Sequence, residues 1–158
     1  MIEVGATLGG QIAQVGIVVP DLDRAVAGAE ALGLMGTFRT YAMESGSFDR
    51  LVHRGRPGEM RFRVALNRST PQIEFIQPVE GESVYSEFLA GRSAGGLHHF
   101  GFVVPDVEAT IRAFAAEGIE PVFHGGGYGR ADDGAFAYFD TTEQLGYWVE
   151  AIEHPRSG

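Results

Sequence analysis

The sequence contains no cysteine and no lysine, and each absence removes a class of chemistry. Without cysteine there is no disulfide, no thiolate nucleophile and no Cys-ligated zinc. All 12 basic residues are arginine, so a lysine Schiff base is excluded as well. No apolar run approaches the length of a membrane span, and Met1–Gln14 lacks the basic residues that begin a signal peptide. We therefore expect a soluble, cytoplasmic protein without a membrane partner.

Positive charge is scarce overall, and the formal net charge is −9. A chain this acidic is poorly suited to nucleic acid, and we expect a small molecule as its partner. Several of the arginines nevertheless gather in one segment. We interpret that segment as a solvated strand face with intramolecular ion pairs, and the alternative is a contact with a substrate phosphate or carboxylate. The five arginines are Arg50, Arg54, Arg56, Arg61 and Arg63.

The most informative feature that is present is an internal repeat. Residues 14–21 read QVGIVVPD and residues 99–106 read HFGFVVPD, an offset of 85 residues that continues without a gap to Gly33 and Gly118. A match at fixed offset indicates one supersecondary unit used twice. Each unit is too small to be comfortably stable alone, so we expect residues 1–158 to form a single domain with a shared core.

Each unit begins with an apolar strand that ends at Pro-Asp. We expect Asp21 and Asp106 to cap the following helices, and Gly33 and Gly118 to occupy their left-handed ends. Each half then reads β-α-β-β-β, in an α+β fold. The modules would span about residues 11–78 and 96–153, with a linker helix within about 80–95. The expected helices are 22–32 and 107–117, and the expected strands are 12–19, 36–41, 47–53, 61–66, 72–77, 98–104, 121–124, 134–140 and 146–152.

A glycine cluster at residues 125–129 lies between two expected strands. A phosphate-binding loop would instead lie between a strand and the start of a helix. We therefore interpret this cluster as a turn or a mobile lid.

Two carboxylates occur in unusually apolar strands. Glu74 and Glu150 each lie in the last expected strand of their half, and burying such a charge is costly unless it is paired or bound to a metal. An arginine such as Arg61 or Arg63 could supply the pairing. If a pseudo-twofold axis relates the halves, however, Gln14, Glu74, His99 and Glu150 converge on one point. Two carboxylates, an imidazole and an amide oxygen suit a divalent ion, Zn, Ni, Co, Mn or Mg.

The segment GLHHFGFVVPDV (residues 96–107), together with the repeat, resembles the vicinal oxygen chelate superfamily. That group contains glyoxalase I, bleomycin-resistance proteins and methylmalonyl-CoA epimerase. The resemblance implies two βαβββ modules in a curled mixed sheet around a metal held by Gln14, Glu74, His99 and Glu150. His98 would then point to the opposite face of its strand. Whether the four ligands come from one chain or from two chains of an expected homodimer stays open.

The resemblance also implies a reaction, the removal of a proton next to a carbonyl through an enediolate that the metal stabilises. Glu150, and after it Glu74, would be the catalytic base. The substrate would be an α-oxo compound or an acyl thioester, with Arg61, Arg63 and His124 as candidate contacts.

The sequence is compatible with three possible functions. Gln14 and the motif GYWVE at 146–150 resemble one type of glyoxalase I, which favours a metal-dependent lyase or isomerase. Residues 81–99 resemble the epimerase branch, so an acyl-CoA epimerase is the alternative, with Glu44 or Glu59 as a base that does not bind the metal. A non-catalytic binding protein on the same fold is the third possibility.

Overall fold

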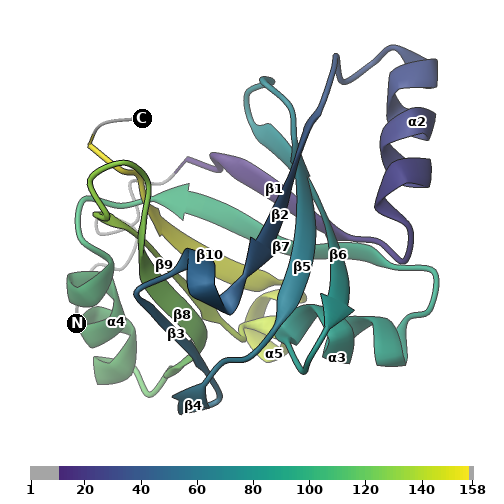
Figure 1. The fold of residues 1–158 in the computed structure, drawn as a ribbon. Coiled ribbons are helices and arrows are strands. Elements are labelled where there is room, and N and C mark those ends of the chain that lie inside the picture. Colours follow the sequence, from purple (N-terminus) through teal and green to yellow (C-terminus); the bar gives the residue numbers. More distant parts are fainter. Residues whose placement is uncertain (1–10, 157–158) are drawn as a thin grey trace.

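The protein forms one continuous ten-stranded mixed sheet that is strongly curled into a half-barrel. The computed structural model describes residues 11–156 (Figure 1). The helices are α2 (Leu22–Leu32), α3 (Val84–Gly91), α4 (Val107–Ala116) and α5 (Thr142–Leu145), with a short 3₁₀ turn at Ser45–Ser47. The strands are β1 (Gln14–Val18), β2 (Arg39–Glu44), β3 (Arg50–His53), β4 (Arg56–Pro57), β5 (Arg61–Leu66), β6 (Gln72–Glu80), β7 (Gly96–Val103), β8 (Pro121–Tyr128), β9 (Gly134–Phe139) and β10 (Trp148–Glu153).

The sheet contains the same four-strand pattern twice. One group runs β2-β5-β6-β1 and the other β7-β10-β9-β8, and the two groups meet where β1 pairs antiparallel with β7. In each group the first and last strands in sequence are parallel neighbours, β1 with β6 and β7 with β10. Helix α2 lies against β5 and β6, and α4 lies against β9 and β10 (Figure 1). The curled sheet predicted from the repeat is confirmed.

The hairpin β3–β4 does not join the first group, where the sequence had placed a strand at 47–53. It pairs instead with β8 of the second group, with Leu51 opposite Gly125 and His53 opposite Phe123. The reason is that β2 and β5 already pair directly, which leaves no edge for another strand between them. The hairpin therefore covers the edge of β8 and links the two groups.

The helix ends follow the predicted capping chemistry. The Asp21 side chain accepts a hydrogen bond from the Arg24 backbone N–H at 3.0 Å, and the Asp106 side chain accepts one from Ala109 at 2.9 Å. Gly33 takes a left-handed conformation with φ of 68°. The helix predicted at 22–32 has those bounds in the structure.

The interpretation of the glycine cluster as a turn or lid is wrong, because Gly125–Gly127 continue strand β8. A Cβ on Gly125 would lie 2.7 Å from the Arg50 carbonyl oxygen and 3.0 Å from the Phe136 ring. These glycines therefore permit close packing of β3 and β9 against β8. The turn comes later, between β8 and β9.

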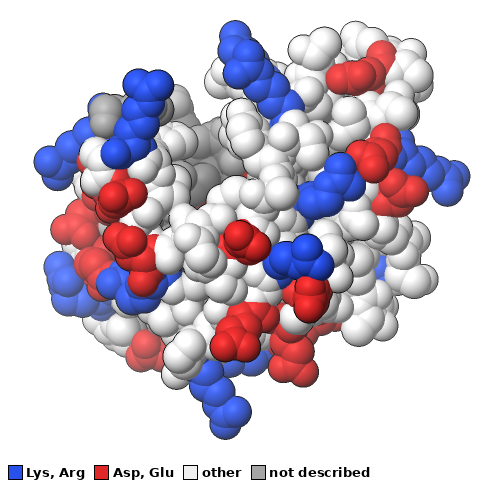
Figure 2. Space-filling model, in the orientation of Figure 1, with Lys and Arg blue, Asp and Glu red and all other residues white. Residues whose placement is uncertain are grey.

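The arginine-rich segment forms intramolecular ion pairs, as its interpretation required. Figure 2 shows acidic and basic side chains lying side by side over much of the visible face. None of the helices in residues 11–156 is long and apolar enough to cross a membrane. The pairs are Arg50–Glu108 (2.8 Å), Arg54–Glu87 (2.7 Å), Arg61–Glu80 (2.6 Å) and Arg63–Asp23 (2.8 Å).

Candidate metal centre

A pocket of about 290 Å³ lies inside the curl of the sheet. Its walls are mostly aromatic and aliphatic, and within residues 11–156 its acidic lining residues are Glu74 and Glu150. Two carboxylates in such a setting need a compensating charge. Both halves of the sheet and helix α3 contribute to the apolar lining, through Met43, Phe62, Val64, Tyr85, Phe136 and Tyr138.

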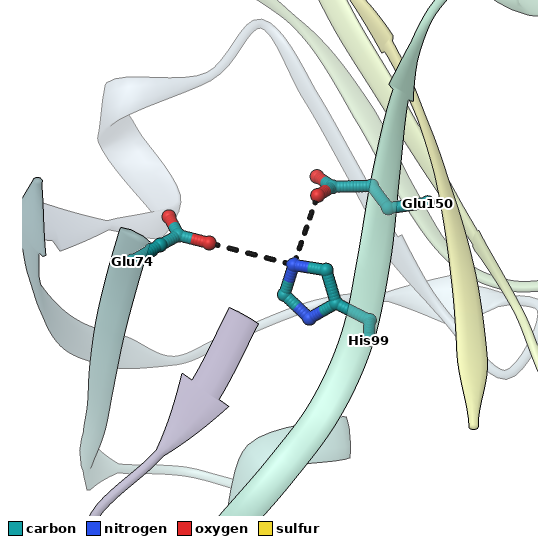
Figure 3. A group of neighbouring side chains, drawn as sticks. All are labelled: Glu74, His99 and Glu150. Atoms are coloured by element: carbon teal, nitrogen blue, oxygen red, sulfur yellow. Dashed lines mark ion pairs between the residues drawn. The ribbon is translucent and has the colours of Figure 1, made fainter. Parts of the chain in front are cut away.

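Glu74 and Glu150 approach His99 from two sides (Figure 3). His99 Nε2 lies 3.1 Å from Glu150 Oε2 and 3.5 Å from Glu74 Oε2, and the His99 side chain is fully buried. One ligand atom from each of the three residues can be chosen so that all lie within 4.8 Å of one another. The Gln14 amide lies beside both carboxylates. One chain thus brings together all four residues singled out in the sequence, from β1, β6, β7 and β10.

Two glycines of the repeat make room for this cluster. Gly16 is the cross-strand neighbour of Glu74 and His99, and Gly101 is the neighbour of Gln14 and Glu150. A Cβ on Gly16 would overlap the His99 ring, and one on Gly101 would lie 3.1 Å from Gln14 Cβ. The sequence analysis missed both glycines, although each stands two residues after a ligand candidate in both copies of the repeat.

The Gln14 amide has two possible orientations, and they distinguish a metal-loaded centre from a metal-free one. In one, Nε2 donates to Gln72 Oε1 at 3.0 Å, which leaves Oε1 facing Glu74 Oε2 and Glu150 Oε2 at 3.2 and 3.1 Å. In the other, the amide nitrogen donates to both carboxylates. An oxygen facing two carboxylate oxygens is repulsive unless a cation lies among them. The first orientation therefore fits a bound divalent ion.

His99 Nε2 gives a second, independent indication of fit. It is buried without a hydrogen-bond partner among the described residues, although the carboxylates lie close to it. A nitrogen in that position is available to a cation between the carboxylates. The donors present, an imidazole nitrogen, an amide oxygen and two carboxylates, therefore fit a divalent metal.

Burial and charge set the protonation of this centre. Burial lowers the pKa of His99, but ion pairing with Glu150 and Glu74 outweighs burial and raises the pKa to about 9. Burial raises the pKa of Glu150 above its ordinary value, although His99 opposes the shift. Without a metal, the imidazolium of His99 neutralises part of the carboxylate charge.

The expectation that His98 points to the opposite face is wrong. A bulge in the β1–β7 pairing at Gly16–Ile17 interrupts the alternation of side chains, so both histidine rings contact Tyr138. His98 stacks on Trp148, with 5.2 Å between ring centroids. Burial, together with the charge of His99, lowers the pKa of His98 to about 2, so His98 is neutral.

Two buried tyrosines extend the site beyond the sequence prediction. Tyr85 of α3 donates to Tyr138 of β9 at 2.9 Å between hydroxyl oxygens, and hydrogen bonding from Tyr138 lowers the pKa of Glu150. Burial, and then the charges of Glu74 and Glu150, raise the pKa of Tyr85. Neither tyrosine was among the candidate site residues of the sequence analysis, although a buried hydroxyl requires a hydrogen-bond partner.

The other candidates lie outside the pocket lining. Arg61 and Arg63 pair with Glu80 and Asp23, so neither neutralises Glu74 or Glu150. His124 lies half-buried on β8 and does not line the pocket. The Glu44 backbone N–H donates to the Ser47 hydroxyl oxygen at the 3₁₀ turn, at 3.2 Å, and Glu59 lies on exposed surface. Glu74 and Glu150 are therefore the carboxylates in reach of a substrate in this pocket.

Comparisons with known proteins show the family of this chain and its similarity in fold to solved structures. Residues 13–139 match the sequence model of the Glyoxalase/Bleomycin resistance protein/Dioxygenase superfamily. No curated protein sequence matches the chain.

The fold is similar to solved structures of low sequence identity. Methylmalonyl-CoA epimerase from Mycobacterium tuberculosis is 22% identical, with a TM-score of 0.60, 92% of this chain covered and 89% of that chain. A Streptomyces coelicolor methylmalonyl-CoA epimerase variant in complex with 2-nitronate-propionyl-CoA is 18% identical, with a TM-score of 0.66 and coverage of 92% and 95%. A hypothetical protein from Bacillus halodurans is 17% identical, with a TM-score of 0.63 and coverage of 94% and 96%.

Proposed function

Because the chain belongs to the Glyoxalase/Bleomycin resistance protein/Dioxygenase superfamily, we propose that it is a divalent-metal-dependent enzyme that removes a proton next to a carbonyl group. One observation carries this proposal. Four ligand-type side chains, Gln14, Glu74, His99 and Glu150, converge at the base of an apolar pocket large enough for a small acyl group.

The four residues would hold Zn, Ni, Co, Mn or Mg. Such an ion supplies Lewis acidity for a substrate carbonyl oxygen, which increases the acidity of the neighbouring C–H bond. The apolar walls exclude water and so strengthen electrostatic interactions within the pocket. Tyr85 positions the Tyr138 hydroxyl group through a hydrogen bond of 2.9 Å, and both tyrosines line the pocket together with Glu150.

Glu150 is the proposed base. Its burial raises its pKa and makes the carboxylate a better proton acceptor than an exposed glutamate. It would take the α-proton onto a carboxylate oxygen while the C–H electron pair moves toward the carbonyl. Return of the proton to the adjacent carbon completes an isomerisation or lyase reaction of the glyoxalase type.

An epimerase is the second candidate, and the position of Glu74 favours it. Glu74 and Glu150 reach the centre from different halves of the sheet, on two sides of His99 (Figure 3). Removal of the proton by one carboxylate and delivery by the other would invert the α-carbon of an acyl thioester. The structural similarity to methylmalonyl-CoA epimerases supports this alternative at the level of the fold.

Hydrogen–deuterium exchange followed by NMR tests the step that both candidates share. The panel contains α-oxo hemithioacetals and acyl-CoA thioesters, each incubated in D₂O with the metal-loaded and the EDTA-treated protein. Metal-dependent exchange of an α-proton is expected for one class. Absence of bound metal after purification without chelator, together with no metal binding by calorimetry, would instead identify a non-catalytic binding protein.

We also propose that the chain is one domain of two modules, that it forms a homodimer and that it acts in the cytoplasm. Light scattering coupled to size-exclusion chromatography tests the dimer. A mass equal to one chain at micromolar concentration contradicts it.

A further inference from the structure

A second, larger pocket of about 740 Å³ adjoins the one that contains the candidate metal centre. Tyr41 and Leu66 line both pockets, so the two pockets are neighbours that share these side chains as a wall. Arg39, Tyr41 and Met43 alternate along β2 and therefore face the same side of the sheet. Arg39 is two residues from Tyr41, which places their backbones roughly 6.6 Å apart along the strand. The pocket that contains Arg39 therefore lies directly beside the one that contains the candidate metal centre.

The second pocket carries uncompensated positive charge. Arg39 and Arg68 both line it, and none of its lining residues within the described range 11–156 is acidic. Neither arginine forms an ion pair with a carboxylate of residues 11–156, whereas Arg50, Arg54, Arg61 and Arg63 all do. Figure 2 shows basic side-chain atoms over the β5–β6 hairpin without acidic atoms beside them. In a chain of net charge −9, two such arginines in one pocket indicate an anionic ligand.

The pocket is held in shape by buried hydrogen bonds. Asn67 is 1% exposed, and its Nδ2 donates to the Met35 carbonyl at 2.9 Å, which ties the β5–β6 hairpin to the segment before β2. Its Oδ1 accepts from the Ile73 N–H at 2.7 Å. These bonds fix the walls that carry Arg39 and Arg68, so the two guanidinium groups are anchored on defined backbone.

The same bonds connect the pocket to the metal centre. Gln72 lines the second pocket, its Nε2 donates to the Asn67 carbonyl at 3.1 Å, and its Oε1 lies 3.0 Å from the Gln14 amide group. The Gln72 side chain therefore lies between the second pocket and Gln14, a candidate metal ligand. A substrate with its carbonyl at the centre would place a tail beside Arg39 and Arg68.

We propose that Arg39 and Arg68 form a subsite for an oxyanion, a phosphate or a carboxylate, on the tail of the substrate. Guanidinium groups bind phosphates and carboxylates alike through paired N–H donors. The inference rests on the proposed function only in identifying the tail as part of a substrate. It predicts that the protein uses substrates with an anionic carrier and discriminates against the same acyl group on a neutral one.

Equilibrium binding tests the subsite without any reaction. Coenzyme A supplies phosphates, glutathione supplies carboxylates, and N-acetylcysteamine is a thiol that lacks both. Calorimetry is carried out with the metal-loaded and the EDTA-treated protein. Coenzyme A or glutathione should bind at least tenfold more tightly than N-acetylcysteamine, and whichever of the two binds identifies the source of the oxyanion.

Arg39→Gln and Arg68→Gln should each weaken binding of that probe by about tenfold. Arg112→Gln is the matched control, because Arg112 is an exposed arginine of α4 outside both pockets. The subsite is refuted if neither anionic probe binds, if the double variant binds as the wild type does, or if Arg112→Gln weakens binding equally. A failure of the proposed reaction would abolish metal-dependent exchange but leave this binding intact.

Discussion

His98 Nδ1 lies 3.1 Å from His99 Nδ1, and both rings are buried. Because His98 is neutral, it can accept the Nδ1–H of His99, which leaves His99 Nε2 free to face Glu74 and Glu150. Ligating histidines are commonly oriented by a partner of this kind. His98 therefore positions His99.

Replacement of His98 tests that role. His98→Phe keeps a ring against Trp148 but removes the acceptor, and we expect metal affinity to fall about 10–100-fold. His98→Gln retains an acceptor and should recover part of the loss. Metal titration by calorimetry measures both, and thermal unfolding in EDTA separates a loss of affinity from a loss of fold. Equal affinities in His98→Phe and the wild type would rule out the positioning role.

Gly16 is expected to be indispensable for the centre. In Gly16→Ala the new methyl group would overlap the His99 ring, so His99 must leave its position and metal binding should be lost. Gly28→Ala is the control, because a Cβ at that position of α2 meets nothing within 4 Å. The control should bind metal normally and gain about 0.5–1 kcal/mol in unfolding free energy, measured by urea denaturation. Normal metal binding by Gly16→Ala contradicts the arrangement.

Metal affinity should depend on pH through His99. Its pKa of about 9 means that the metal-free protein holds a proton at neutral pH, which the ion must displace. We expect the apparent association constant to rise by up to about tenfold per pH unit below pH 9, with proton release detected by calorimetry in buffers of different ionisation enthalpy. A flat profile from pH 6.5 to 9 would mean that His99 is not a ligand.

The metal-free protein should show the opposite trend in stability. His99 has a higher pKa in the folded protein, about 9, than its ordinary value of 6.5. Its contribution to stability is therefore complete below pH 6.5 and is lost as pH rises through 9. Urea denaturation in EDTA should give a lower midpoint at pH 9 than at pH 6.5. His99→Asn, which has no imidazole, should reduce this difference.

The two carboxylates can be assigned separate roles by substitution. Glu150→Gln should reduce α-proton exchange by about 10²–10⁴-fold if Glu150 is the base. In a two-base epimerase, Glu150→Gln and Glu74→Gln should each block exchange from one stereoisomer of the substrate and spare the other. Exchange is measured by NMR on metal-loaded variants whose metal content has been determined. A near-normal rate in Glu150→Gln excludes it as the base.

The sequence by itself determined much of this protein. The repeat predicted two related strand–helix units, and Asp21, Asp106 and Gly33 marked their helix ends because capping depends on local backbone groups. The same repeat singled out Gln14, Glu74, His99 and Glu150, since equivalent positions in equivalent units face one another across a pseudo-twofold axis.

Other features depended on which strand edges and bulges the fold contains, and only the tertiary structure decided them. The β3–β4 hairpin pairs with the far half of the sheet because β2 and β5 leave no space between them. His98 lies beside His99, with its ring against Tyr138 and Trp148, because a bulge shifts the register. Arg39 and Arg68 share a pocket because β2 and the β5–β6 hairpin lie side by side, a proximity of residues far apart in sequence that local pattern does not encode.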